Sequence, residues 1–244
     1  MKRNARLAHL YIPALLLPLV AGCPLSVNSN EIAVTYDPDP QHFMQDFGTQ
    51  TGMLMDVSCA GNPALCAAVP APMGTTASCD SATQKCILTA QLAAAQTVTL
   101  ANESTFPSSV ANAAVSNVEV RVMRYWTPTN TLTFDTPPID VYVGPQGATK
   151  PTDAGVTKLG TMPPLAKMTQ TMCRAGGAGT KDSYCEMPLT ADGKSALSLL
   201  AKNYKTPFNI LVAGTLTARG GQPMPAGKLD MYVQPQLVFA IPLR

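Results

Sequence analysis

The chain has 244 residues, of which 46% are hydrophobic and only 13% charged, and its formal net charge is +2. Its lysines and arginines are scattered singly, which excludes the clustered positive face that nucleic-acid binding requires. The 22 prolines and 17 glycines favour many short strands joined by turns and argue against a helical bundle.

Residues 1–22 have the order of a secretory signal peptide. A basic start with Lys2, Arg3 and Arg6 precedes an apolar stretch at residues 10–20, and small residues follow it. A membrane-spanning helix needs roughly 20 apolar residues, so this shorter stretch predicts a signal that is removed and not a permanent transmembrane anchor. Without the three signal cations, 14 basic residues face 15 acidic ones, and the mature chain is nearly neutral.

The signal ends in Val20-Ala21-Gly22-Cys23, which resembles the lipobox of bacterial lipoproteins. The resemblance covers residues 1–23 only. It implies that Cys23 is acylated and becomes the first mature residue, with residues 23–30 as a tether. Several acyl chains on one residue make a lasting membrane anchor. An ordinary signal peptide with a chance cysteine is the alternative.

The lipobox also implies a location in the bacterial cell envelope. Pro24 stands where, in the enteric sorting rule, an aspartate would signal retention in the inner membrane. Its absence favours lipid anchoring at the outer membrane, facing the periplasm or the surface.

Six cysteines remain beyond Cys23, and an even number in an exported protein predicts a disulfide framework. They are Cys59, Cys66, Cys79, Cys86, Cys173 and Cys185. Their separation into two groups predicts a bridge between Cys173 and Cys185 and two bridges among the first four, whose pairing stays open. Gaps of six or twelve residues do not match the short spacings of zinc sites, so we expect no metal and no cofactor.

The first half of the mature chain contains several predicted strands. Residues 31–36 form a first strand that Asp37-Pro38-Asp39-Pro40 ends, residues 41–57 are ambiguous, and residues 58–86 are cysteine-rich loops. Further strands are expected at 86–92, 97–101, 116–126, 131–134 and 139–143, and the loop 144–160 ends in another. Within 116–126, alternation predicts Val118, Val120 and Val122 on one face and Met123 on the other.

One helix is predicted at residues 191–203, with Thr190 or Asp192 as its cap and Leu197, Leu200 and Ala201 on its apolar side. Strands at 208–218 and 229–243 follow, joined by a hairpin loop. This order predicts a mainly β fold, an antiparallel β-sandwich of the immunoglobulin-like or a related kind. Residues 31–244 would form one domain, or two subdomains at 31–105 and 106–244.

Sequence motifs for catalysis are absent: G-x-S-x-G, H-E-x-x-H, the P-loop and G-x-G-x-x-G do not occur. His42 is the one histidine after the signal, and it lies among Asp37, Asp39 and Asp46. A surface histidine in an acidic turn is the simpler interpretation. We therefore expect a protein that is not an enzyme.

Three classes of function stay open. The first is a noncatalytic structural or assembly lipoprotein that contacts another envelope protein and reaches the membrane through its N-terminal lipid. The second is a module that binds a glycan or peptide, with Tyr125, Trp126 and Tyr142 as its aromatic platform. The third is a hydrolase, which would need His42 beside a hydroxyl and a carboxylate.

Overall fold

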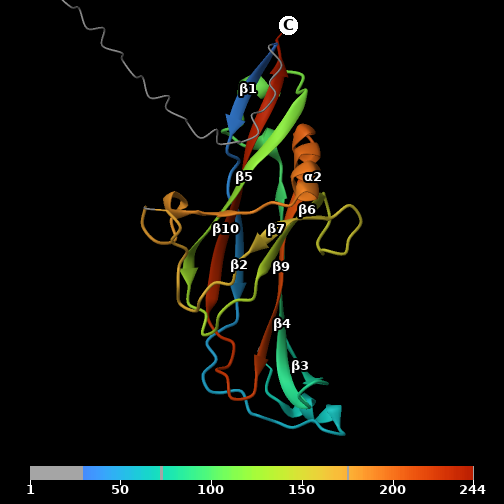
Figure 1. Ribbon diagram of the computed structural model, residues 1–244, viewed down its shortest axis with the longest axis vertical. Coiled ribbons are helices and arrows are strands. Elements are labelled where there is room, and N and C mark those ends of the chain that lie inside the picture. Colours follow the sequence, from blue (N-terminus) through green and yellow to red (C-terminus); the bar gives the residue numbers. More distant parts are fainter. Residues whose placement is uncertain (1–29, 72–73, 175, 244) are drawn as a thin grey trace, which may run out of the picture.

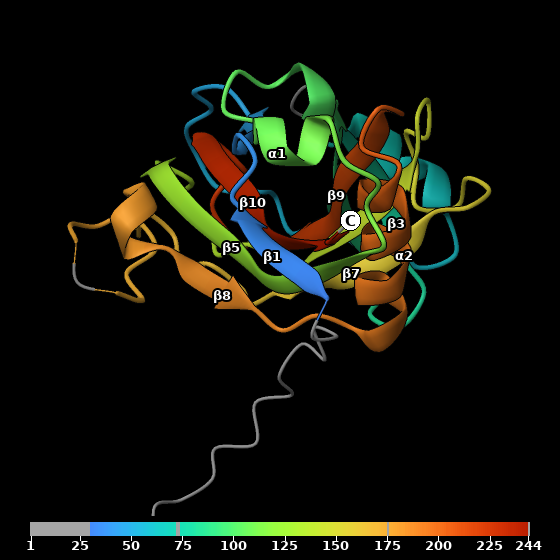
Figure 2. The same cartoon turned by 90° about the horizontal axis from the view of Figure 1, so that it is seen from above.

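Two antiparallel sheets packed face to face form the molecule (Figures 1 and 2). The computed structural model describes residues 30–71, 74–174 and 176–243. The predicted signal, Cys23 and most of the tether lie outside the described residues. Within them, each sheet has five strands, and the predicted antiparallel β-sandwich is confirmed.

The first sheet is built around the longest strand, β10 (Lys228–Pro242). Both β1 (Glu31–Tyr36) and β2 (Gln41–Asp46) pair with one edge of β10, and β5 (Asn117–Asn130) pairs with its other edge. The short β8 (Cys185–Met187) lies outside β5. The two prolines between β1 and β2 lack N–H donors, which explains why this edge is divided into two strands.

The second sheet has the order β3 (Thr75–Asp80), β4 (Lys85–Val98), β9 (Phe208–Arg219), β6 (Ile139–Pro145) and β7 (Thr157–Met162). Residues 31–105 contribute β1 and β2 to the first sheet and β3 and β4 to the second. A division of the chain at residue 105 would therefore cut both sheets.

The core between the sheets is filled from alternate positions of the strands, including Phe208 and Phe239. In β5, Val118 and Val120 are buried as predicted, but Val122 is partly exposed and Met123 is fully buried. The pairing with β10 shifts between Gln236 and Leu237, which are opposite Val122 and Val120. This irregularity adds one residue to β5 and reverses the alternation beyond it.

Two other strand predictions are wrong, one in its extent and one altogether. β4 continues without a break to Val98, and a short 3-10 helix, η2 (Leu100–Asn102), replaces the end of the expected strand 97–101. Residues 131–134 are not a strand; the N–H groups of Thr131 and Thr133 donate to the carbonyls of Lys228, the first residue of β10, and of Ala226 just before it. The ambiguous segment 41–57 contains β2.

The predicted helix is α2 (Ala191–Lys202). Oγ1 of Thr190 caps it by accepting the N–H of Gly193 at 2.9 Å. Leu197 and Ala201 are fully buried, and the helix contacts β5, β6 and β7, so that it closes one side of the sandwich (Figure 2). The shorter helices are α1 (Ser108–Ala111), η1 (Pro63–Ala68) and η3 (Lys181–Ser183). No helix in the described ranges is long and apolar enough to cross a membrane.

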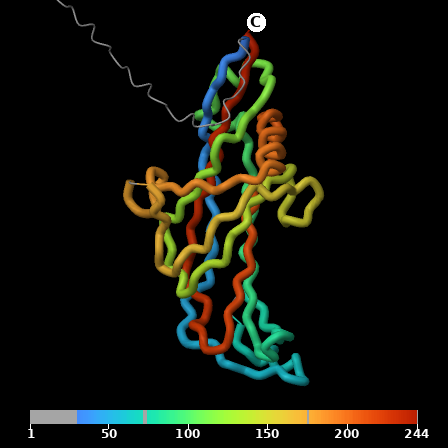
Figure 3. Tube along the Cα trace, in the orientation of Figure 1, coloured from blue at the N-terminus to red at the C-terminus, as the bar shows by residue number. Residues whose placement is uncertain are grey.

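The sandwich is elongated, and the trace in Figure 3 shows its two poles. At one pole the described chain begins and ends, and the N–H of Leu243 donates to the carbonyl of Asn30 at 2.7 Å. At the other pole lie β3 and the start of β4 (Figure 1). β10 alone has 15 residues and, at about 3.3 Å per residue, spans about 50 Å.

Candidate functional site

The pole opposite the termini carries two of the three disulfides. Cys59 is bonded to Cys79 and Cys66 to Cys86, with Cα–Cα distances of 5.9 and 5.3 Å. Both bridges join the segment around η1 to the β3–β4 hairpin. We call this pole the stapled tip; it comprises residues 53–69, the β3–β4 hairpin and the loop 219–224.

The pairing confirms the prediction of two bridges among the first four cysteines. Cys79 and Cys86 are direct neighbours across the hairpin, yet each is bonded to the η1 segment instead. The sulfurs of Cys59, Cys66 and Cys79 lie within 4.8 Å of one another, but all three are in disulfides. They are therefore not thiolate ligands for a metal.

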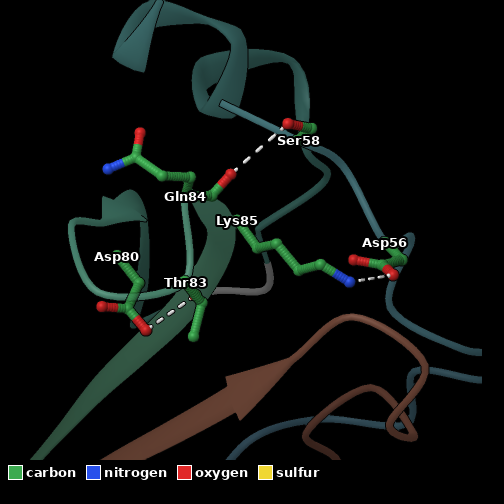
Figure 4. A network of polar contacts seen from close by, with 6 residues as sticks. All are labelled: Asp56, Ser58, Asp80, Thr83, Gln84 and Lys85. Atoms are coloured by element: carbon green, nitrogen blue, oxygen red, sulfur yellow. Dashed lines mark hydrogen bonds and ion pairs between the residues drawn. The ribbon is translucent and has the colours of Figure 1, made fainter. Parts of the chain in front are cut away.

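Polar contacts fix the chain that enters the tip (Figure 4). Nζ of Lys85 lies 2.6 Å from Oδ2 of Asp56, and the N–H of Cys86 donates to the carbonyl of Val57 at 2.8 Å. Oγ1 of Thr83 donates to Oδ2 of Asp80 at 2.9 Å in the hairpin turn. The N–H of Ala82 holds the pKa of the Asp80 carboxyl below its usual value, with Thr83 adding to the effect. The turn and the entering segment are thus tied to β4.

The tip has a small core of its own and an apolar exterior. Leu54, Val69, Leu88 and Met224 pack with the buried cysteines in a cluster separate from the main core. Three large apolar side chains in the same segment point to solvent instead: Met53 is 60% exposed, Met55 53% and Leu65 45%. A rigid scaffold that exposes apolar side chains can bind a protein surface.

The structure does not bring together the aromatic platform predicted from Tyr125, Trp126 and Tyr142. Tyr125 is 3% exposed and belongs to the main core, whereas Trp126 follows it on the opposite face of the same strand. Tyr142 lies on β6 in the other sheet, near Asp140. The alternation of a strand separates neighbouring side chains, so this platform is not formed.

Trp126 instead belongs to a row of rings across three strands. The ring of Tyr232 is stacked 5.3 Å from Trp126 on one side and 4.6 Å from His42 on the other. The cross-strand register explains the row, because Tyr232 is paired with both residues. Trp126 is only 5% exposed, so its indole ring offers little surface to a sugar.

His42 also contacts a carboxylate, with Nε2 at 3.4 Å from Oδ1 of Asp230. Among the described residues no serine or threonine is hydrogen-bonded to His42. The arrangement thus supplies a carboxylate beside the imidazole but not the hydroxyl that the hydrolase hypothesis requires.

The third disulfide is Cys173–Cys185, as predicted, with a Cα–Cα distance of 4.9 Å. It closes a loop beside β5. The guanidinium groups of Arg124 and Arg174 lie 4.8 and 4.5 Å from the ring centre of Tyr184 within this loop. These cation–π contacts, with ion pairs to Asp37 and Glu186, hold the loop on the outer face of the first sheet.

Comparisons with known proteins identify no family. No family model matches the chain, and no curated protein matches it. The chain is similar to a solved structure from Desmodium yellow mottle tymovirus at 12% identity and a TM-score of 0.29, covering 99% of this chain and 98% of that one. A structure from turnip yellow mosaic virus has 12% identity and a TM-score of 0.22, with coverage of 100% and 92%. Both TM-scores are too low to bear on function. The class that the fold defines is a disulfide-containing antiparallel β-sandwich protein.

Proposed function

We propose that this protein is a lipid-anchored envelope lipoprotein with a noncatalytic assembly role, in which the stapled tip contacts another envelope protein. The observation that carries the proposal is that the chain enters at one end of the elongated sandwich and the stapled tip lies at the other end. The chain enters the sandwich at one pole, and the segment 53–65, which carries the exposed Met53, Met55 and Leu65, lies at the other (Figure 1). Other large apolar side chains are exposed singly along the molecule, such as Ile32 and Leu199, but none of them lies on a segment held by two disulfides.

The position of Cys23 supports the membrane end of this proposal. It precedes Asn30, the first described residue, by seven residues. Seven residues span at most about 25 Å when fully extended, so a lipid on Cys23 would keep the entry pole near the bilayer. The tip would then stand away from the membrane by a distance on the order of the 50 Å of β10.

The disulfides support the tip end. The two bridges and the contacts to β4 hold the η1 segment in place although its core is small. The segment therefore does not need to bury Met53, Met55 and Leu65 in order to stay folded. An exported protein with structural bridges also fits an oxidising compartment. The proposal includes outer-membrane placement, which is favoured by Pro24 at the position where an aspartate would signal retention in the inner membrane.

The anchor is tested with Cys23→Ser in the full chain. We expect wild type to incorporate labelled palmitate and to be cut before Cys23, and the variant to lose palmitate and to be either uncut or soluble. Ala21→Gly is the matched control, because it alters the signal near the cut but keeps the acceptor thiol. Incorporation of palmitate by Cys23→Ser would contradict the anchor.

The tip contact is tested by a photoreactive amino acid placed at position 55 or 65 in living cells. We expect both positions to cross-link to the same protein, and position 150, in the loop between β6 and β7, to give no such product. Leu65→Glu should abolish the cross-link from position 55. Equal products from positions 55 and 150 would contradict a partner at the tip.

A further inference from the structure

One edge of β5 is left open by the short strand beside it. β8 pairs only with Met123, Arg124 and Tyr125. Residues 117–120 and 122 pair with β10 on one side, with Arg121 as the extra residue of the irregularity between them, and no other described strand pairs with this stretch on the other side. In an antiparallel strand, alternate residues direct their N–H and C=O groups to each side. Half of these groups therefore face outward unpaired.

A groove runs along this open edge, between β5 and α2. Its first part has a volume of about 470 Å³ and lies between residues 117–120 of β5 and Lys194, Ser198 and Lys202 of α2. A second part of about 320 Å³ continues along Arg121 and Val122 to the residues after β8, and Lys194 borders both parts. After Met187 the chain leaves β5, and Leu189 forms a bridge with Gly160 of β7. No described strand therefore continues the pairing of β8 along residues 117–122 of β5.

The charges of the groove favour an acidic occupant. Lys194, Lys202 and Arg121 take part in no ion pair among the described residues, whereas Glu186 is already paired with Arg174. Glu119 is the remaining carboxylate, and its Oε2 is buried without a hydrogen-bond partner.

The helix also fixes the distance between two lysines of the groove. Lys194 and Lys202 are eight residues apart in α2, which is about 12 Å along the helix axis. Four residues of an extended strand cover about 13 Å and return to the same face. An extended segment with acidic side chains four residues apart would place one of them near each lysine.

We propose that the open edge of β5 binds an extended acidic peptide segment. The segment would pair with β5 as a further strand of the first sheet, in line with β8. The backbone of residues 117–122 would supply the hydrogen bonds, and Lys194 and Lys202 would select the acidic side chains. The site is independent of the stapled tip and of the lipid anchor, so each proposal can fail without the other.

The test uses the purified full chain in detergent and a fluorescent peptide, acetyl-VTEVTVEV-amide, whose glutamates are four residues apart. We expect saturable binding by anisotropy, and about tenfold weaker binding when both glutamates are replaced by lysine, since exposed ion pairs contribute modestly. On binding, the amides of residues 117–122 should exchange more slowly with solvent. Absence of saturable binding would overturn the proposal.

Two N-methylated peptides test the strand itself. One is methylated at its odd residues and the other at its even residues. We expect only one of them to lose binding, because only one set of N–H groups faces β5. Equal affinity of the two peptides would overturn strand addition.

Variants of the protein locate the site. The double variant Lys194→Glu and Lys202→Glu should weaken binding about tenfold, and Ser198→Trp should block it by filling the groove. The matched control is Lys150→Glu with Lys181→Glu, which makes the same charge change on exposed loops away from the groove and should leave affinity unchanged. Equal loss in the control, with all variants folded by circular dichroism, would overturn the assignment of the groove.

Discussion

Tyr36, which is buried, and Glu103, which is partly exposed, form a pair that connects the end of β1 to the loop after η2. The Tyr36 hydroxyl donates to Oε2 of Glu103, and the N–H of Asp39 donates to the same oxygen at 2.9 Å. Burial raises the pKa of both side chains, and for Tyr36 the hydrogen bond to Glu103 adds to the rise. The folded state therefore favours the protonated form of each group.

This pair predicts a pH dependence of stability. Because the pKa of Glu103 is raised above its ordinary value of 4.5, the folded state binds a proton that the unfolded state releases, and the free energy of unfolding falls as pH rises from 4.5 through the raised value. Glu103→Gln should flatten this fall in urea unfolding measured between about pH 4.5 and 8.

Glu186→Gln, at an exposed ion pair, is the control and should keep the slope. The lowered pKa values of Asp46, Asp80, Asp140 and Asp153 act in the opposite sense, because their stabilisation is lost only as pH falls below the ordinary value of 3.8. An unchanged slope in Glu103→Gln above pH 4.5 would contradict the role of this carboxyl.

At the scale of elements, α2 depends on its N-terminal cap. Oγ1 of Thr190 accepts from Gly193 and also donates to the carbonyl of Lys158 at 2.7 Å, so it joins the helix to β7. We expect Thr190→Ala to lower the free energy of unfolding by about 1–2 kcal/mol and Thr190→Ser to restore most of it. Chemical denaturation measures both.

Ser195→Ala is the comparison within the same helix. Its Oγ donates to the carbonyl of Ala191, one turn earlier, where the backbone ladder already exists. We expect a change below about 0.5 kcal/mol. A larger loss for Ser195→Ala than for Thr190→Ala would contradict the cap as the critical contact.

The local stability of the stapled tip depends on its disulfides more than on the main core. Removing the Cys66–Cys86 bridge by Cys66→Ala and Cys86→Ala should cost about 3 kcal/mol, given a separation of 20 residues. Amide exchange should rise mainly in residues 53–69, because this segment has little core beyond the small cluster. Removing Cys173–Cys185 should instead raise exchange near residues 166–186, and a change spread evenly over both sheets would contradict a separate tip.

The whole molecule is one interleaved sandwich. Both sheets contain strands from before and after residue 105. β10, the last strand, pairs with β1, β2 and β5, which are all far from it in sequence. Neither residues 31–105 nor residues 106–243 can form the two sheets alone, so we expect the sandwich around the main core to unfold as one cooperative unit.

Trp126 makes this expectation measurable, since it is the single tryptophan of the chain and lies in the first sheet. Under nonreducing conditions, its fluorescence and the far-ultraviolet circular dichroism signal should give the same unfolding midpoint. Trp126→Phe, which keeps a ring against Tyr232, controls for the fluorophore and should show the same circular dichroism transition. Two separate midpoints would contradict a single unit.

Much of the local structure follows from the sequence alone. The sequence predicted strands where β1, β6, β9 and β10 lie, and the capped apolar pattern predicted α2, because these signals come from residues close in the chain. The separation of the cysteines likewise predicted Cys173–Cys185. In each case, nearby residues determine the outcome.

Other features were decided only by the tertiary structure. The choice of Cys59–Cys79 and Cys66–Cys86 depends on where η1 packs against the hairpin, and the burial of Met123 depends on the register between β5 and β10. The row of His42, Tyr232 and Trp126 and the open edge beside α2 likewise arise from pairing between distant strands. Sequence spacing cannot show such pairing, because the energy that selects it comes from burying the main core as a whole.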